Sequence, residues 1–205
     1  ALHGELRAAP AKIPVPDGGS ENIESLSKYN FKQIVAACPH CFNTLKTNIR
    51  SLRAAPSPSP ATFSSLPNCS KETHFAKTGA SRSVTFHDAC YLARHNGIGR
   101  DPRTILETIG VKLKDPENAA ATPCVAARAA PNLHGQASRI NILRLEQLNK
   151  TGTDEIAVSC PHCLTMLTSA QAQTCGRDET PKPVRDIAEI VAHAITQSTI
   201  NPSKE

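Results

Sequence analysis

The tetrad Cys-Pro-His-Cys occurs twice in this chain, at residues 38–41 and 160–163. The surrounding sequences also match, since IVAACPHCFNTL begins at Ile34 and IAVSCPHCLTML begins at Ile156, a shift of 122 residues. The same shift aligns Glu24 with Glu146, Leu26 with Leu148 and Lys28 with Lys150. We therefore predict a repeated unit of helix, strand, tetrad and helix, of which the chain holds the end of a first copy and nearly all of a second.

Strands and helices alternate along the second copy. Short apolar, β-branched runs predict strands at 84–88, 111–115 and 155–160, with another at 31–37 in the first copy. Apolar residues at helical spacing predict helices at 102–109, 138–151, 163–171 and 184–195. This alternation indicates an α/β fold, a small and mainly parallel sheet with helices packed on it. Cys90 and Cys160 follow two of the strands, where such sheets place their ligands.

Composition divides the chain into five segments. We predict a loop or disordered tail at 1–20, the end of the first copy at 21–50, a disordered linker rich in Ser and Pro at 51–83, the second copy at 84–196 and a tail at 197–205. The net charge of +5 comes without a run of like charges, so we expect no nucleic-acid partner. We also expect no membrane span and, because the only methionine is Met166, a fragment of a longer protein.

Eight cysteines are many for a chain without a secretory signal, and they favour metal binding or redox chemistry over structural disulfides. A Cys-x-x-Cys pair between a strand and a helix suits thiol–disulfide exchange, a zinc site or an iron–sulfur cluster. Zinc-binding pairs typically lie about 15–20 residues apart, far closer than these two tetrads. An iron–sulfur cluster needs thiolates from separate loops, and this requirement is met by Cys90, Cys124, Cys160 and Cys163.

The segment FHDACYLARHNGIGRDPRTILETIG, which begins at Phe86, closely resembles the HDPCYLGRHNG segment of the cysteine-rich CCG domain. This family includes a subunit of heterodisulfide reductase and the iron–sulfur subunits of glycolate and lactate oxidases. Its motif combines a single Cys, a Cys-Cys-Gly and a Cys-x-x-Cys, at the positions of Cys90, Cys124, Cys160 and Cys163. The resemblance implies that these four residues hold a [4Fe–4S] cluster, cubane or non-cubane. Cys38 and Cys41 would be metal ligands of the preceding copy.

The resemblance also implies a function and partners. Electrons would come from a flavoprotein subunit or an electron-transferring flavoprotein and pass towards quinone or a disulfide acceptor. We expect a subunit that needs these partners for activity. It would be cytoplasmic, or associated with the membrane through partner subunits or an upstream region.

One departure from the family pattern leaves alternatives open. Val125 and Ala126 follow Cys124 where the family has Cys and Gly, and Val cannot supply a thiolate. A local reading-frame error over residues 125–138 would explain this difference. Otherwise the chain is a non-catalytic remnant, or a zinc-bound structural domain that has lost its cluster. A Cys-x-x-Cys thiol–disulfide oxidoreductase is the third possibility.

Three further features have two interpretations each. His40 and His162, inside the tetrads, either tune a thiolate or cluster through a hydrogen bond or are ordinary turn residues. His87 and Asp88 suggest a general base, but we favour a structural role for them. Cys69 and Cys175 match nothing in the family pattern, so we predict spare thiols.

Overall fold

The computed structural model describes residues 24–29, 34–51, 82–117, 119, 125, 139–176 and 179–200. Its elements, in chain order, are α2 (Pro39–Ser51), β1 (Ser83–His87), α4 (Cys90–Asn96), α5 (Asp101–Thr108), β2 (Lys112–Leu113), α6 (Ile140–Asn149), β3 (Glu155–Val158), α7 (Pro161–Thr174), β4 (Val184–Asp186) and α8 (Ile187–Ile200). The predicted α/β alternation of the second copy is confirmed. Within these ranges, no helix combines the length and the apolar character that crossing a membrane requires.

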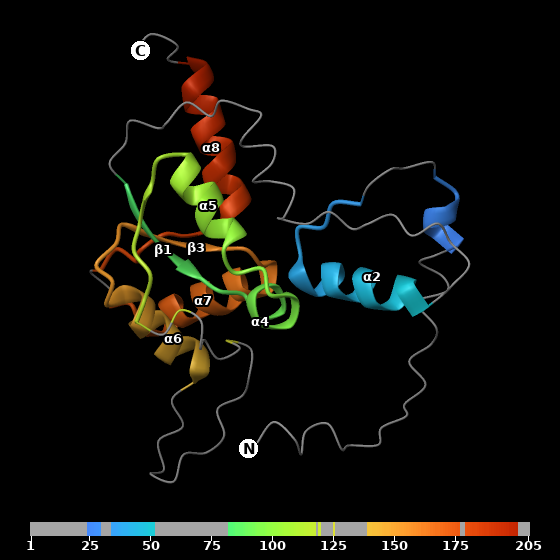
Figure 1. Ribbon diagram of the computed structural model, residues 1–205. Helices are drawn as coiled ribbons and strands as arrows, with labels where there is room; N and C mark the ends of the chain where they lie inside the picture. Colours follow the sequence, from blue (N-terminus) through green and yellow to red (C-terminus); the bar gives the residue numbers. More distant parts are fainter. Residues whose placement is uncertain are drawn as a thin grey trace.

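The four strands form one parallel sheet in the order β2-β1-β3-β4. Helices α6 and α7 cover one face of this sheet, and α5 and α8 cover the other (Figure 1). The chain passes from β1 outwards to β2 on one side and from β3 outwards to β4 on the other. The two central strands therefore flank a topological switch point, the place where open α/β sheets open a crevice for ligands.

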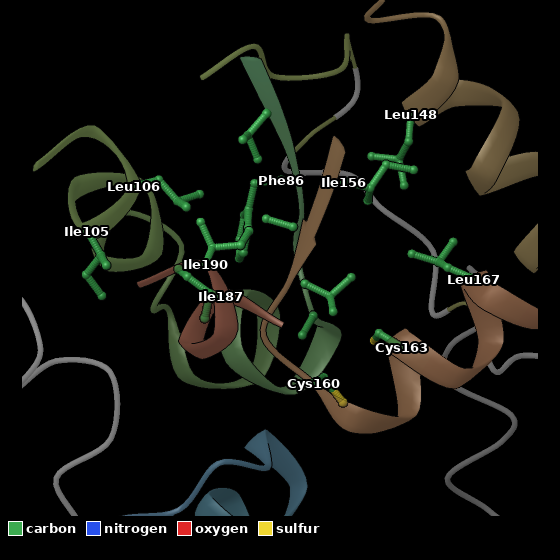
Figure 2. Packing of buried hydrophobic residues seen from close by; sticks show 14 of the residues in the cluster. Phe86, Ile105, Leu106, Leu148, Ile156, Cys160, Cys163, Leu167, Ile187 and Ile190 are labelled. Atoms are coloured by element: carbon green, nitrogen blue, oxygen red, sulfur yellow. The ribbon is translucent and has the colours of Figure 1, made fainter. Parts of the chain in front are cut away.

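The core has two apolar layers, one on each face of the sheet (Figure 2). Phe86 of β1 lies on the side of Leu106 and Ile190, whereas Ile156 of β3 lies on the side of Leu148 and Leu167. All but Ile190 are at most 1% exposed. Burying a side chain of this size contributes about 1.5–3 kcal/mol, so these layers stabilise the two central strands.

The structure corrects the closing helix expected at 184–195. Its first three residues form the edge strand β4, in which Val184 pairs with Ile156, and α8 begins only at Ile187. Two prolines at 181 and 183 favour extended backbone on entry to this strand. The Asp186 carboxylate then accepts a hydrogen bond of 2.9 Å from the Ala188 N–H and so caps α8.

The strand expected at 31–37 is also corrected within the described residues. Ile34 makes a single bridge, and residues 35–37 are not in a strand. A strand needs a neighbour for its backbone groups, and every strand of the four-stranded sheet comes from the second copy. The segment instead leads directly into α2.

Segment boundaries differ by a few residues elsewhere. Ser83 already belongs to β1, not to the linker expected at 51–83. Helix α8 extends to Ile200, into the residues expected to form a tail. Helix α5 begins at Asp101, one residue before the start expected at 102, and Arg100 occupies its N-cap position. The tail predicted at 1–20 and the linker from 52 to 81 lie outside the described residues.

Candidate functional site

Three cysteines lie at the carboxyl ends of the two central strands. Cys90 begins α4 shortly after β1, Cys160 is the N-cap residue of α7 just after β3, and Cys163 lies in the first turn of α7. Cys90 is 7% exposed, Cys160 0% and Cys163 4%. Figure 2 shows Cys160 and Cys163 at the edge of the apolar core, where the chain turns from β3 into α7. The thiols from the two strands therefore lie at the switch point of the sheet.

The environment of Cys160 favours its thiolate form. Its pKa falls from 9.0 to about 5, chiefly because the Cys163 thiol donates a hydrogen bond to its sulfur. Burial opposes this shift, and the main-chain N–H groups of residues 163 and 162, at the start of α7, add to it. An electrostatic interaction with His40 lowers the Cys160 pKa further. At neutral pH Cys160 therefore carries the form of cysteine that binds metals and attacks disulfides.

The first tetrad reaches this same site. His40 Nδ1 lies 3.9 Å from the sulfur of Cys38 and 3.9 Å from the sulfur of Cys160. The His40 ring also packs on the Tyr91 ring, with 4.2 Å between the centroids. The sequence predicted two copies of a tetrad but not that they would meet, so this contact is a new finding.

Cys41 differs from Cys160. Its side chain is exposed, and its pKa is raised, first by the hydrogen bond with Cys38, then by partial burial and by the charge of Cys38. Cys41 therefore resists forming the thiolate, although Cys160 forms it readily.

Helix α2 is held against α4 by the amide of Asn96 (Figure 1). Lys46 donates a hydrogen bond of 3.1 Å to the side-chain oxygen, Oδ1, of Asn96. The Asn96 NH₂ group donates to the side-chain oxygen of Asn43 at 3.1 Å and to the carbonyl of Tyr91 at 2.6 Å. Phe42, 4% exposed, anchors the same helix. These contacts place the first tetrad beside the second.

His87 and Asp88 have separate partners, as a structural role would require. Arg144 Nε donates to His87 Nδ1 at 3.3 Å, and both residues are 1% exposed. Burial, with the charges of Arg144 and Arg94, lowers the His87 pKa to about 3, so its ring is neutral. Asp88 instead accepts two hydrogen bonds of 2.8 Å from Arg103. Both pairs brace the segment that leads into Cys90.

Nothing in the sequence pattern identified Arg103 or Arg144 as partners. Arg144 lies in α6, and the buried side of that helix was predicted from its apolar residues alone. The sequence did contain one signal for such partners. His87 and Asp88 end an otherwise apolar strand, and polar side chains buried there need hydrogen-bond partners.

The remaining cysteines are placed as follows. Cys69 and Cys124 lie outside the described residues. Val125, next to Cys124, is 2% exposed and belongs to the apolar core. The Cys175 thiol, at the end of α7, donates to the carbonyl of Glu179 at 3.2 Å. None of the described cysteines forms a disulfide.

The chemistry of the buried donors fits an iron–sulfur cluster better than a single metal ion. Sulfur ligands from two separate loops, one of them already a thiolate, are what such a cluster requires. A zinc ion needs four donors at about 2.0–2.3 Å from one point. In the part of the chain that the structure describes, no three His, Cys, Asp or Glu side chains are arranged to hold a metal ion. The zinc alternative thus finds no support there.

Comparison with known proteins agrees with the resemblance seen in the sequence. The model of the CCG cysteine-rich domain matches residues 15–46 and 84–168. A probable membrane-anchored ferredoxin of Chromohalobacter salexigens is 30% identical over 185 residues, 85% of this chain and 27% of that protein. An EtfAB:quinone oxidoreductase of Syntrophomonas wolfei is 28% identical over 86% of this chain and 26% of its own length.

A third relative comes from Methanosarcina barkeri. It is one subunit of a dihydromethanophenazine:CoB–CoM heterodisulfide reductase, 27% identical over 87% of this chain and 44% of its own length. The chain thus spans between a quarter and a half of the relatives that it matches. Because the family model covers more than half of the 205 residues, in the two segments 15–46 and 84–168, the chain belongs to the CCG cysteine-rich domain family.

Proposed function

We propose that this chain is the iron–sulfur electron-transfer part of an oxidoreductase. The observation that carries the proposal is the position of Cys90, Cys160 and Cys163, which bring buried sulfur from two strand ends to the switch point of the sheet. The names of the relatives, a ferredoxin and two oxidoreductases, support the same chemistry. Members of one family share a site more readily than a whole activity.

Four cysteines would hold the cluster: Cys90, Cys124, Cys160 and Cys163. A [4Fe–4S] cluster, cubane or non-cubane, would supply one-electron transfer when bound. The chain contributes the rest. The apolar core keeps water from the three buried sulfurs, and the start of α7 supplies N–H groups to Cys160. Fixed N–H donors at a ligand sulfur set the potential of a cluster.

The finer proposal concerns electron flow. The relatives named for EtfAB and quinone, and for a heterodisulfide, support a flavoprotein donor and a quinone or disulfide acceptor. The name of the membrane-anchored relative supports contact with a membrane through partner subunits. Cys38 and Cys41 would then serve the preceding copy of the domain, beside the cluster of the second.

The test is to measure iron, acid-labile sulfide and the absorption spectrum after anaerobic reconstitution. We expect iron and sulfide in stoichiometric amounts, and their loss in the Cys160→Ser, Cys163→Ser double variant. Cys175→Ser is the matched control, because this thiol lies at the far end of α7 and bonds to Glu179. Wild-type protein that takes up zinc alone, or no metal, would instead indicate a structural remnant.

A second candidate function rests on the placement of Cys160 beside Cys163 at the start of a helix, where the pKa of Cys160 is about 5. This arrangement is typical of thiol–disulfide exchange. If it is the function, metal-free protein reduces a disulfide substrate, and Cys163→Ser alone abolishes that activity. Reduction that persists in Cys163→Ser would exclude this candidate.

A further inference from the structure

The two histidines of the repeated tetrads are equivalent in sequence but not in structure. His40 is half-buried, and its Nδ1 lies 3.9 Å from the Cys160 sulfur of the other copy. His162 is exposed, and its ring meets the His40 ring edge-on at 6.3 Å between centroids. The first copy therefore contributes a ring to the sulfur site of the second, and no reciprocal contact from His162 to Cys38 is among the described hydrogen bonds.

The orientation of His40 is fixed by its surroundings. Its ring packs on the Tyr91 ring, tilted by 41° with 4.2 Å between the centroids. Tyr91 follows Cys90 directly at the start of α4, so the contact with His40 lies next to another of the buried cysteines. Helix α2 is meanwhile tied to α4 through Asn96. A ring held from two sides keeps its nitrogen towards the sulfur at little further cost in conformational entropy.

We propose that His40 is a positioning residue for the site of the second copy, holding the Cys160 sulfur through its Nδ1 and joining the two tetrads into one centre. This inference rests on the proposed function, because the group that Cys160 holds is the cluster. It goes further in assigning a role across the repeat to a residue outside the Cys motif of the second copy. A hydrogen bond to a ligand sulfur stabilises the reduced, more negative state of a cluster.

The test compares four variants in two measurements. The first is the reduction potential of the reconstituted protein, and the second is the alkylation rate of Cys160 in metal-free protein, followed by peptide mass spectrometry. His40→Ala removes the contact. His40→Asn can place an N–H where Nδ1 lies, whereas His40→Gln reaches the position of Nε2. His95→Ala is the control, since it removes an exposed ring that touches Tyr91 but not the sulfur.

We expect His40→Ala and His40→Gln to shift the potential to more negative values. They should also speed alkylation of Cys160, because a thiolate that loses a hydrogen bond is the stronger nucleophile. A single net hydrogen bond predicts a change of roughly two- to tenfold in that rate. His40→Asn should restore both properties towards wild type, and His95→Ala should leave both near wild type. Equal behaviour of the Asn, Gln and Ala variants would overturn the proposal, because the ring would then serve only to fill space.

The two measurements separate this inference from the proposed function. If no cluster can be reconstituted, the proposed function fails, but the alkylation rates still decide whether His40 holds the Cys160 sulfur. If the cluster forms and neither property responds to His40→Ala, the function stands and the positioning role is wrong.

Discussion

His87 and Arg144, 57 residues apart, meet inside the protein with Arg144 Nε 3.3 Å from His87 Nδ1. The nitrogen that accepts this hydrogen bond cannot also carry a proton, so the neutral ring is the form that fits. Protonation would place a second cation beside a buried guanidinium. The pair therefore makes the stability of the fold depend on pH.

We predict that the free energy of unfolding falls as the medium is acidified. The folded His87 has a pKa of about 3, below its ordinary 6.5, so the unfolded chain binds the proton more readily between these values. The contribution of His87 is complete above pH 6.5 and is lost as the pH falls towards 3, at up to about 1.4 kcal/mol per pH unit. Urea unfolding at a series of pH values measures this slope.

The control for this prediction is His87→Asn. The Asn carbonyl oxygen can accept from Arg144 where Nδ1 does, but Asn does not titrate. The variant should lose the slope that His87 contributes below pH 6.5. An unchanged slope in a folded His87→Asn protein would assign the pH dependence to other groups.

The two carboxylates on Arg103 should differ in their effect on stability. Asp88 is 5% exposed at its side chain and Asp115 is 41% exposed, while both bind the guanidinium at 2.8 Å. Removing one partner of a buried ion pair costs about 3–5 kcal/mol, whereas exposed pairs contribute about 0–1 kcal/mol. We therefore expect Asp88→Asn to lower the free energy of unfolding by several times more than Asp115→Asn.

Chemical denaturation of both variants measures the difference. Asp115 makes three hydrogen bonds with Arg103 and Asp88 makes two, so a larger loss at Asp88 would come from its burial and not from the number of its bonds. Equal losses in the free energy of unfolding would mean that the two ion pairs contribute alike and that the burial of Asp88 does not strengthen its pair.

The sequence is sufficient for the elements that carry their own pattern. The strand at 84–88 and the helix at 138–151 are recognisable because their apolar residues repeat at the period of the element. β4 is not, since its three residues continue into a helix and only the pairing of Val184 with Ile156 makes them a strand. The strand predicted at 31–37 is wrong for the converse reason. Its residues have the pattern of a strand, but a pattern does not provide the neighbouring strand with which it must pair.

The candidate site divides in the same way. Placement of Cys90 and Cys160 at neighbouring strand ends follows from the order of elements, and the structure brings those ends together. The assignment of the four cysteines as cluster ligands stays a prediction. The approach of His40 to Cys160 could not be predicted, because no local pattern sets how α2 packs on α4.

Asn96 should control whether the first tetrad stays at the site. Asn96→Ala loses the hydrogen bonds with Lys46, Asn43 and the Tyr91 carbonyl together, whereas Asn43→Ala keeps the bond from Lys46 to Asn96 and loses the bond that Asn43 accepts from Asn96. At about 0.5–1.5 kcal/mol for each bond, the first variant should loosen α2 more. Hydrogen exchange of the α2 amides should be faster in Asn96→Ala than in Asn43→Ala. Similar protection in the two variants would mean that Phe42 and the packing of His40 on Tyr91 hold α2 in place without the hydrogen bonds of Asn96.

Val125 offers a test of the departure from the family pattern. It follows Cys124, where the resemblance to the family predicts the second Cys of Cys-Cys-Gly, and it is 2% exposed in the core. Val125→Cys is a small change in volume, with an expected loss of about 1 kcal/mol in the free energy of unfolding. If the site is otherwise intact, the added thiol should raise iron and sulfide content after reconstitution.

Val125→Ala is the control, because it also removes volume but adds no sulfur. It should be destabilised at least as much as Val125→Cys and should gain no iron. A rise in iron content confined to Val125→Cys would show that the valine limits cluster binding. Folded Val125→Cys protein with the iron content of wild type would mean that the thiol at this position does not reach the site proposed for Cys90, Cys160 and Cys163.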